Sequence, residues 1–155
     1  MIMHTIERTQ RIPISLDEAW SFFQNPENLS KITPNEMGFH ILSEVPNKMY
    51  PGLFINYEVS PLFGIKMNWS TEITHVDAPN YFVDEQRAGP YAIWHHEHHF
   101  QKIDGGVEML DRVNYQVPLG ILGKLAHPLI VKPKLEEIFD YRIKKVEEIF
   151  GKWEK

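Results

Sequence analysis

The 155-residue chain contains no cysteine, which excludes disulfide bonds, thiol nucleophiles and cysteine-ligated zinc sites. It also lacks an excess of basic residues. The 21 Asp and Glu against 16 Lys and Arg give a formal net charge of -5, so no basic face is available for nucleic acid. No apolar run approaches the roughly 18 residues of a membrane-spanning helix, and the N-terminal residues lack the apolar core of a signal peptide.

The residues that are present have an ordinary globular composition, 43% hydrophobic and 24% charged. A chain of this length can bury most of its apolar surface within one domain. No internal repeat, low-complexity tract or linker divides the sequence. We therefore expect a single domain over residues 1–155, in a protein that is soluble and cytoplasmic. The sequence does not indicate its oligomeric state.

The N-terminal part predicts one strand followed by two short helices. Alternating side chains over residues 5–13 indicate the strand. Ser15 and Glu18 form a capping box, which predicts that a helix begins there. Asn25-Pro26 ends that helix and begins a second one, because proline is favoured at the first helical position. Thr33-Pro34 then ends the second helix.

From residue 39 the apolar period changes to two, which predicts six further strands. These cover residues 39–45, 53–59, 65–76, 81–87, 91–102 and 107–117. In the strand over residues 65–76, unbroken alternation places Ile65, Met67, Trp69, Thr71, Ile73 and His75 on one face. After Pro118 the pattern becomes helical, and we expect Pro128 and Pro133 to bend or break this helix. Beyond Pro133 an apolar stripe recurs at helical spacing. It consists of Leu135, Ile138, Phe139, Val146, Ile149 and Phe150. The fold class is therefore α+β, a meander sheet covered by one long helix.

Histidines gather in the strand over residues 91–102. Trp94, His96, His98 and Phe100 share one face, and the two aromatic residues mark it as the inward face. Two inward histidines at this spacing suit either a metal ion or a general base. They equally suit a hydrogen-bonded pair that lines a pocket. Because no third ligand is fixed by the sequence, we favour the second interpretation and expect no metal and no cofactor.

Two acidic residues lie on strand faces that are otherwise apolar. Asp84 shares its face with Phe82 and Gln86, and Asp111 shares its face with Tyr115. A buried carboxylate without a partner costs several kcal/mol, so each acid needs a partner.

Arg142 supplies a partner for these acids. It falls between Phe139 and Val146 on the apolar stripe of the last helix and therefore faces the sheet. We expect it to meet Asp111, Asp84 or an anionic group of a ligand.

Several pieces of the sequence, in order, resemble the bacterial ligand-binding branch of the SRPBCC superfamily, the START-like or polyketide-cyclase-like proteins. They are Ile32-Thr-Pro34, Gly38-Phe39, Asp84-Glu-Gln86, Gly89-Pro-Tyr91, Trp94-His-His-Glu-His98, Phe100, Asp111, Tyr115, Pro118-Leu-Gly120 and Phe139-Asp-Tyr-Arg142. The resemblance implies a helix-grip fold, in which a curved seven-stranded antiparallel sheet wraps around a long C-terminal helix and leaves a cavity. Relatives bind lipids, quinones, plant hormones or polyketides, and some are cyclases or oxygenase domains. The iron–sulfur and mononuclear-iron motifs of the oxygenases are not visible in this chain.

These observations favour a binding or carrier protein for a small hydrophobic molecule such as a lipid, a quinone or a polyketide. The expected ligand-binding residues combine apolar walls with a polar end. They are Met67, Trp69, Phe82, Asp84, Gln86, Trp94, His96, His98, Asp111, Tyr115 and Arg142. The segments 61–64 and 119–133 are expected to form the mouth of the cavity.

The alternative is an enzyme of the cyclase, dehydratase or hydrolase type, in which His96 or His98 is a general base oriented by Asp111 or Asp84. A protein–protein module is a third possibility that no feature of the sequence specifically indicates.

Overall fold

One curved antiparallel sheet forms the body of the protein. The computed structural model describes residues 2–61 and 63–154, and its seven strands are arranged in the order β1-β7-β6-β5-β4-β3-β2. The strands are β1 (His4–Ile12), β2 (His40–Ile41), β3 (Phe54–Val59), β4 (Met67–Asp77), β5 (Tyr81–Ala88), β6 (Ile93–Ile103) and β7 (Gly106–Gln116). Every neighbouring pair for which a register is defined is antiparallel.

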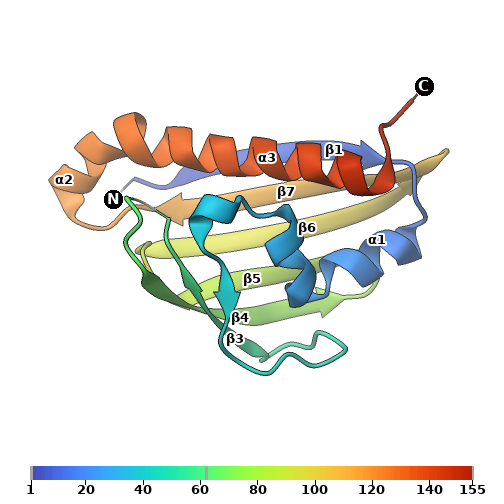
Figure 1. Ribbon diagram of the computed structural model, residues 1–155, viewed down its shortest axis with the longest axis horizontal. Coiled ribbons are helices and arrows are strands. Elements are labelled where there is room, and N and C mark those ends of the chain that lie inside the picture. Colours follow the sequence, from blue (N-terminus) through green and yellow to red (C-terminus); the bar gives the residue numbers. More distant parts are fainter. Residues whose placement is uncertain (1, 62, 155) are drawn as a thin grey trace.

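The helices pack on the concave side of this sheet (Figure 1). Between β1 and β2 lie α1 (Leu16–Phe23) and two 3₁₀ helices, η1 (Pro26–Ile32) and η2 (Asn35–Met37). After β7 the chain forms α2 (Gly120–Ala126), the π-helical segment η3 (His127–Val131) and α3 (Lys132–Phe150). In Figure 1, α3 runs along the length of the sheet beside β1, and the other strands curve away beneath it. This arrangement is the helix-grip fold, and it confirms the predicted fold class.

The N-terminal helices begin where the sequence predicts. Ser15 Oγ accepts a hydrogen bond from the Glu18 amide, and a Glu18 carboxylate oxygen accepts one from the Ser15 amide. Asn25 caps η1 by accepting from the Glu27 amide. These caps satisfy amide groups that would otherwise lack partners at the helix ends. The second short helix is a 3₁₀ helix rather than an α-helix.

Two strand predictions need correction. The strand expected over residues 39–45 contains only the two residues of β2. In β4, the pairing with β5 shifts register between Ile73 and His75. A bulge of this kind reverses the side-chain alternation that follows it. His75 is therefore exposed, whereas Val76 packs against the core.

The prolines were expected to bend or break the C-terminal helix; the helical region is continuous, so it is not broken, but it departs from the α-helical form at Pro128. Pro128 lies within η3, where π-helical pairing accommodates a residue that lacks an amide proton. Pro133 follows directly, at the junction where the π-helical segment passes into α3. The apolar stripe of α3 faces the sheet through the buried Leu135, Phe139 and Val146. Ile149, at the edge of the stripe, is exposed.

None of the helices among the described residues combines the length and the apolar character needed to cross a membrane. The buried apolar side chains form three clusters beneath the helices. One joins α3 to β6 and β7, and another joins α1 and η1 to the same strands. Between the clusters the sheet and α3 do not fully meet, and this gap holds the candidate site.

Candidate functional site

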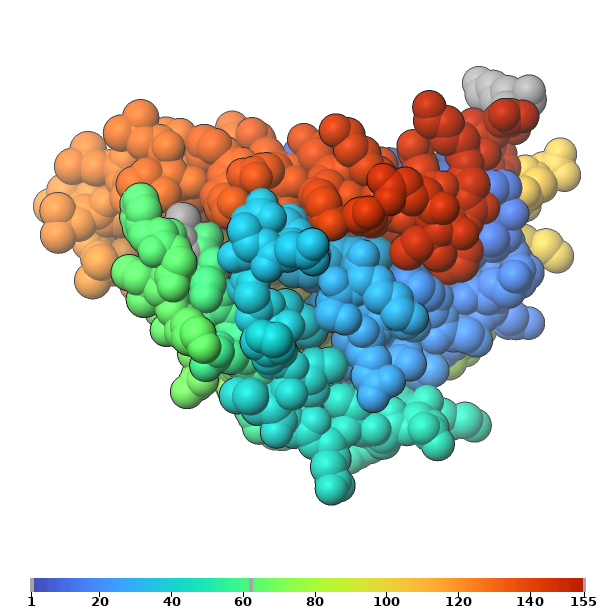
Figure 2. All heavy atoms as spheres, in the orientation of Figure 1, coloured from blue at the N-terminus to red at the C-terminus, as the bar shows by residue number. Residues whose placement is uncertain are grey.

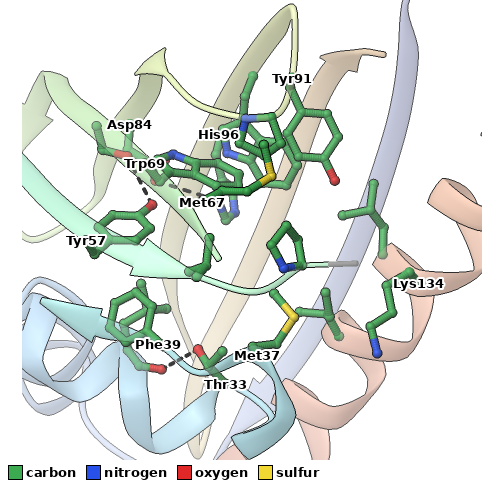
Figure 3. A pocket seen from close by; sticks show the side chains of 18 of the residues that line it. Thr33, Met37, Phe39, Tyr57, Met67, Trp69, Asp84, Tyr91, His96 and Lys134 are labelled. Carbon is green, nitrogen blue, oxygen red and sulfur yellow. Dashed lines mark hydrogen bonds and ion pairs between the residues drawn. The ribbon is translucent and has the colours of Figure 1, made fainter. Parts of the chain in front are cut away.

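A cavity of about 500 Å³ lies between the concave face of the sheet and α3. Its walls are mostly apolar, and the lining reaches the exposed side chains of Met67 at the start of β4 and of Leu119 and Leu122 at α2. In Figure 3, Trp69 and His96 lie on the sheet side of the cavity, and Lys134 projects from α3 opposite them. This volume is within the range of about 300–1,000 Å³ that is typical of pockets for small molecules.

Most of the residues that the sequence predicts for the ligand site do line this cavity. They are Met67, Trp69, Phe82, Asp84, Trp94, His96, His98 and Arg142. They come from β4, β5, β6 and α3, whose inward faces converge because the sheet curves around the helix. Met67 lies at the start of β4 and is partly exposed. The cavity predicted from the sequence is therefore present and has the predicted polar end.

Three of the predicted residues do not border the cavity. Gln86 turns back onto its own hairpin, where its side-chain amide donates to the Tyr91 carbonyl (2.6 Å) and accepts from the Tyr91 amide (3.0 Å). Tyr115 is buried, and its hydroxyl hydrogen-bonds His127 Nε2 at 2.7 Å. Asp111 borders a second, smaller hollow of about 30 Å³ behind the main cavity. None of these three residues forms part of the wall of the main cavity.

The polar end of the cavity is a buried network of two imidazoles and two carboxylates. His98 lies between the acids: its Nε2–H donates to Asp84 Oδ2 (2.6 Å), and its Nδ1 lies 3.2 Å from Asp111 Oδ1. His96 Nε2–H donates to the same oxygen of Asp111 (2.8 Å). Because carboxylates only accept, these contacts fix which imidazole nitrogens carry protons. Asp111 therefore orients both histidines from behind.

Arg142 completes the network from α3. Its Nη1 lies 3.9 Å from Asp111 Oδ1, and its guanidinium carbon lies 4.9 Å from the centre of the Phe139 ring. The side chain is only 12% exposed. The prediction that Arg142 faces the sheet and meets an inward acid is thus confirmed for Asp111.

Burial and the neighbouring groups shift the pKa values of the two histidines in opposite directions. Burial opposes a positive charge on His96, the nearby His98 adds to this effect, and the pKa of His96 is lowered. Burial also opposes a charge on His98, but its hydrogen bonds to Asp111 and Asp84 outweigh burial and raise its pKa. Both ring nitrogens of His98 face carboxylate oxygens, which only accept, so we assign His98 as the imidazolium; we assign His96, whose pKa is lowered, as neutral.

The same contacts keep both acids ionised. Burial disfavours the Asp84 carboxylate, but the imidazoles of His96 and His98 outweigh it and lower the pKa of Asp84. Burial likewise disfavours the Asp111 carboxylate, but the hydrogen bonds from His96 and His98 overcome it and hold the pKa of Asp111 well below the usual range. Two carboxylates are then balanced by one imidazolium and one guanidinium, so the network carries no net charge.

A metal ion could be held only by a subset of these groups. Asp84, His96 and His98 bring ligand atoms within 4.8 Å of one another, facing the cavity. However, Asp84 Oδ2 and His98 Nε2 lie 2.6 Å apart, a distance typical of a shared proton. Two ligands that each sit about 2.0–2.2 Å from one ion are farther apart than this in tetrahedral geometry. An ion would therefore have to displace the proton and separate the pair.

Part of the cavity wall lies outside the predicted set of ligand-binding residues. Tyr57 and Thr71 line it side by side, with their hydroxyls 3.1 Å apart. Thr33, Met37 and Phe39 close the opposite end, as Figure 3 shows. The signal for the last group was available, because Ile32-Thr-Pro34 and Gly38-Phe39 are among the pieces that carry the family resemblance.

The outward histidines of β6 have a different role. His95 Nδ1 contacts Glu85 at 2.7 Å, and His99 Nε2 contacts Glu97 at 2.8 Å, both on the solvent face of the sheet. These contacts are cross-strand or same-strand pairs that stabilise the sheet surface modestly. Only the inward histidines belong to the site.

Comparison with known proteins adds the fold but no function. Neither a protein-family model nor a curated protein matches the chain. Solved structures do match it. Protein CV1439 from Chromobacterium violaceum is 12% identical, with a TM-score of 0.72 over 95% of this chain and 96% of that chain. TTHA0849 from Thermus thermophilus is 15% identical, with a TM-score of 0.67 over 94% and 95%. Ara h 8.0201 is 16% identical, with a TM-score of 0.59 over 95% and 99%. The helix-grip fold therefore extends over nearly the whole chain.

Proposed function

We propose that the protein binds one small, mostly apolar molecule in the cavity between the sheet and α3, and that it acts as a binding or carrier protein. The observation that carries this proposal is a cavity of about 500 Å³ with mostly apolar walls and one buried polar end. Empty apolar space of this size costs stability, because its lining atoms lose their packing partners, and a bound apolar molecule would restore those contacts.

The charge balance of the network narrows the chemical class of the ligand. Asp84, Asp111, His98 and Arg142 already neutralise one another at the polar end. A charged ligand group placed there would be buried without a counter-charge, at a cost of several kcal/mol. A neutral hydroxyl can donate a hydrogen bond to the unprotonated Nδ1 of His96, and a neutral carbonyl can accept one from the hydroxyl pair of Tyr57 and Thr71. We infer a neutral amphipathic ligand, such as a quinone, a polyketide-like phenol or a lipid alcohol.

Membership of the ligand-binding branch of the SRPBCC superfamily is part of this proposal. The quoted motifs and the helix-grip fold support it. The motif residues Asp84, His96, His98, Asp111 and Arg142 also form one connected network, although they come from four separate elements. Such a network gives a physical reason why these residues occur together.

The cavity can be tested with a neutral fluorescent probe, N-phenylnaphthylamine, whose emission rises in apolar surroundings. Ala126→Trp places an indole in the lining of the cavity near its mouth. Ala88→Trp adds the same group at an exposed position of β5 outside the lining. We expect saturable binding by the wild type and the Ala88 variant, and at least roughly tenfold weaker binding by the Ala126 variant. Equal affinity for all three proteins would contradict the proposed site.

The preference for neutral ligands has its own matched pair of probes. Naphthol and naphthoate share the same apolar body and differ in the charge of the polar group at neutral pH. We expect naphthol to displace N-phenylnaphthylamine at lower concentration than naphthoate. The reverse order would show that the polar end is built for an anion, with Arg142 as its anchor.

An enzyme is the second candidate, and the structure restricts which residue could act. His98 has both ring nitrogens close to carboxylates, so it is not free to accept a proton from a substrate. His96 lines the cavity, has a lowered pKa and is oriented by Asp111, and its Nδ1 lies 3.6 Å from Asp84 Oδ2, beyond hydrogen-bond distance. If the protein catalyses a cyclisation, a dehydration or a hydrolysis, His96 is the expected base. His96→Gln should then abolish turnover while leaving the affinity for the neutral probe nearly unchanged.

A further inference from the structure

The most exposed apolar side chains of the protein gather around the cavity opening. They come from two segments, the connection before β4 and the region from Leu119 through α2 to η3. We define the mouth surface as Phe63, Ile65, Leu119, Ile121, Leu122, Leu125 and Leu129. Each of these side chains is at least 62% exposed, and no other large apolar side chain in residues 2–61 and 63–154 exceeds 61%. Concentrated exposure of this kind marks an interaction site.

The two segments lie next to each other in space. Figure 2 shows the loop before β4, in green, directly beside α2, in orange, at one end of the molecule. The cavity lining extends into both segments, through Pro61 and Met67 on one side and Leu119 and Leu122 on the other. The entrance to the apolar cavity therefore opens within the mouth surface.

Within the two segments of the mouth surface, every Asp, Glu, Lys or Arg residue is a lysine. Neither residues 59–71 nor residues 113–135 contain an Asp or Glu, although the whole chain has a net charge of -5. The same segments contain Lys66, Lys124, Lys132 and Lys134. Lys66 and Lys134 pair with nearby glutamates. Among the described residues, Lys124 and Lys132 have no ion-pair partner within 4.0 Å.

We propose that the mouth surface docks on a lipid bilayer that contains anionic lipids. Leucine and isoleucine side chains flanked by lysines are the composition of segments that lie in a membrane interface. The lysines complement the negative surface of such a bilayer, whereas the acidic remainder of the protein stays in water. Because the cavity opens within this surface, an apolar ligand passes between membrane and cavity without crossing water.

Vesicle co-sedimentation tests the apolar part of this surface. The probes are vesicles of phosphatidylcholine, with and without phosphatidylserine. Leu129→Asp changes an exposed residue of the mouth surface that does not line the cavity, and Leu42→Asp changes an exposed leucine of another region. We expect the wild type and the Leu42 variant to bind the vesicles within about twofold of each other. The Leu129 variant should bind at least roughly tenfold more weakly.

The lysines are tested by Lys124→Gln combined with Lys132→Gln. We expect this double variant to lose roughly tenfold or more in affinity for vesicles with phosphatidylserine, and little for phosphatidylcholine alone. High salt should have the same effect on the wild type, because salt screens the attraction.

Other outcomes would overturn the proposal. It fails if the wild type does not bind vesicles, or if the Leu129 and Leu42 variants bind them equally well. It also fails if the wild type forms a dimer that Leu129→Asp dissociates while no vesicle binding is seen, since the surface then serves a second copy of the chain. Probe binding by the Leu129 variant separates this result from the cavity proposal. That variant should still bind N-phenylnaphthylamine like the wild type, because Leu129 is outside the cavity.

Discussion

Replacement of Arg142 by methionine tests whether the charges of the buried network compensate one another. Arg142 is the only cation that α3 contributes to the network among the described residues, and its side chain is 12% exposed. Methionine keeps most of the apolar stem that packs beside Phe139 and removes the charge. The substitution therefore leaves one of the two carboxylates, Asp84 or Asp111, without a compensating charge.

The contacts of Asp111 lead us to expect a smaller loss of stability from Arg142→Met than from breaking a buried ion pair completely. Breaking a buried pair costs about 3–5 kcal/mol when the remaining charge has no other partner. Asp111 keeps its hydrogen bonds from His96 and His98 after the substitution, and the contact from Arg142 Nη1 is long at 3.9 Å. We therefore expect the free energy of unfolding to fall by about 2–3 kcal/mol.

Chemical denaturation at neutral pH measures this change, with two control variants. Lys145→Met removes a cation that pairs with Glu148 on the exposed side of α3, and it should leave the free energy of unfolding close to the wild-type value. Asp111→Asn should be destabilising alone, because it unbalances the network in the opposite sense. Combined with Arg142→Met it restores neutrality, so the double variant should lose less than the sum of the two single losses.

Two results would refute this reasoning. If Arg142→Met changes the free energy of unfolding by less than about 0.5 kcal/mol, Arg142 is solvated and plays no part in the network. If the effects of Arg142→Met and Asp111→Asn simply add, the two groups do not interact, and the inferred neutrality has no basis.

The remaining predictions concern protons and metals. Nitrogen NMR of the imidazoles should show His98 still protonated above pH 6.5 and His96 still neutral below it; the reverse order would contradict the assigned hydrogen bonds. The contribution of His98 to the free energy of unfolding should be fully present below pH 6.5 and should be lost as the pH rises through the raised pKa of His98. The contributions of Asp84 and Asp111 to the free energy of unfolding should be present above pH 3.8 and should be lost as the pH falls through their lowered pKa values. The stability of the Asp111→Asn variant should therefore fall less steeply with decreasing pH than that of the wild type. Zinc should leave the melting temperature unchanged, because the ion would have to displace the proton between His98 and Asp84; a rise that His96→Ala removes would instead establish a metal site.

The sequence predicted the elements that rest on strong local signals. The capping box at Ser15 and Glu18, the alternating face of Trp94, His96 and His98, and the helical phase of Arg142 each follow from a short-range rule, and all are confirmed. A two-residue or 3.6-residue period specifies a side-chain direction without reference to the rest of the molecule.

The errors occurred where distant parts of the chain decide the local structure. The bulge that exposes His75 depends on the pairing of β4 with β5, and it has no signature in β4 itself. The π-helical turn over His127–Val131 keeps Pro128 within the helical region. Proline rules describe a regular α-helix and do not distinguish a π-helical turn from a break.

The periodicity of the sequence also could not predict every residue of the cavity wall. Gln86 and Tyr115 were expected in the lining because they share faces with inward residues. An inward side chain can still be occupied by a closer partner, as Gln86 is by Tyr91 and Tyr115 is by His127. Only the three-dimensional arrangement shows which inward groups remain free to meet a ligand.

Native mass spectrometry of protein purified without detergent tests the central proposal most directly. If the cavity serves a neutral apolar ligand, the wild type should retain one small molecule per chain, or take up N-phenylnaphthylamine with a stoichiometry of one. Ala126→Trp should greatly reduce that occupancy, and Ala88→Trp should not. Repeated recovery of an empty protein that takes up no probe would contradict the account.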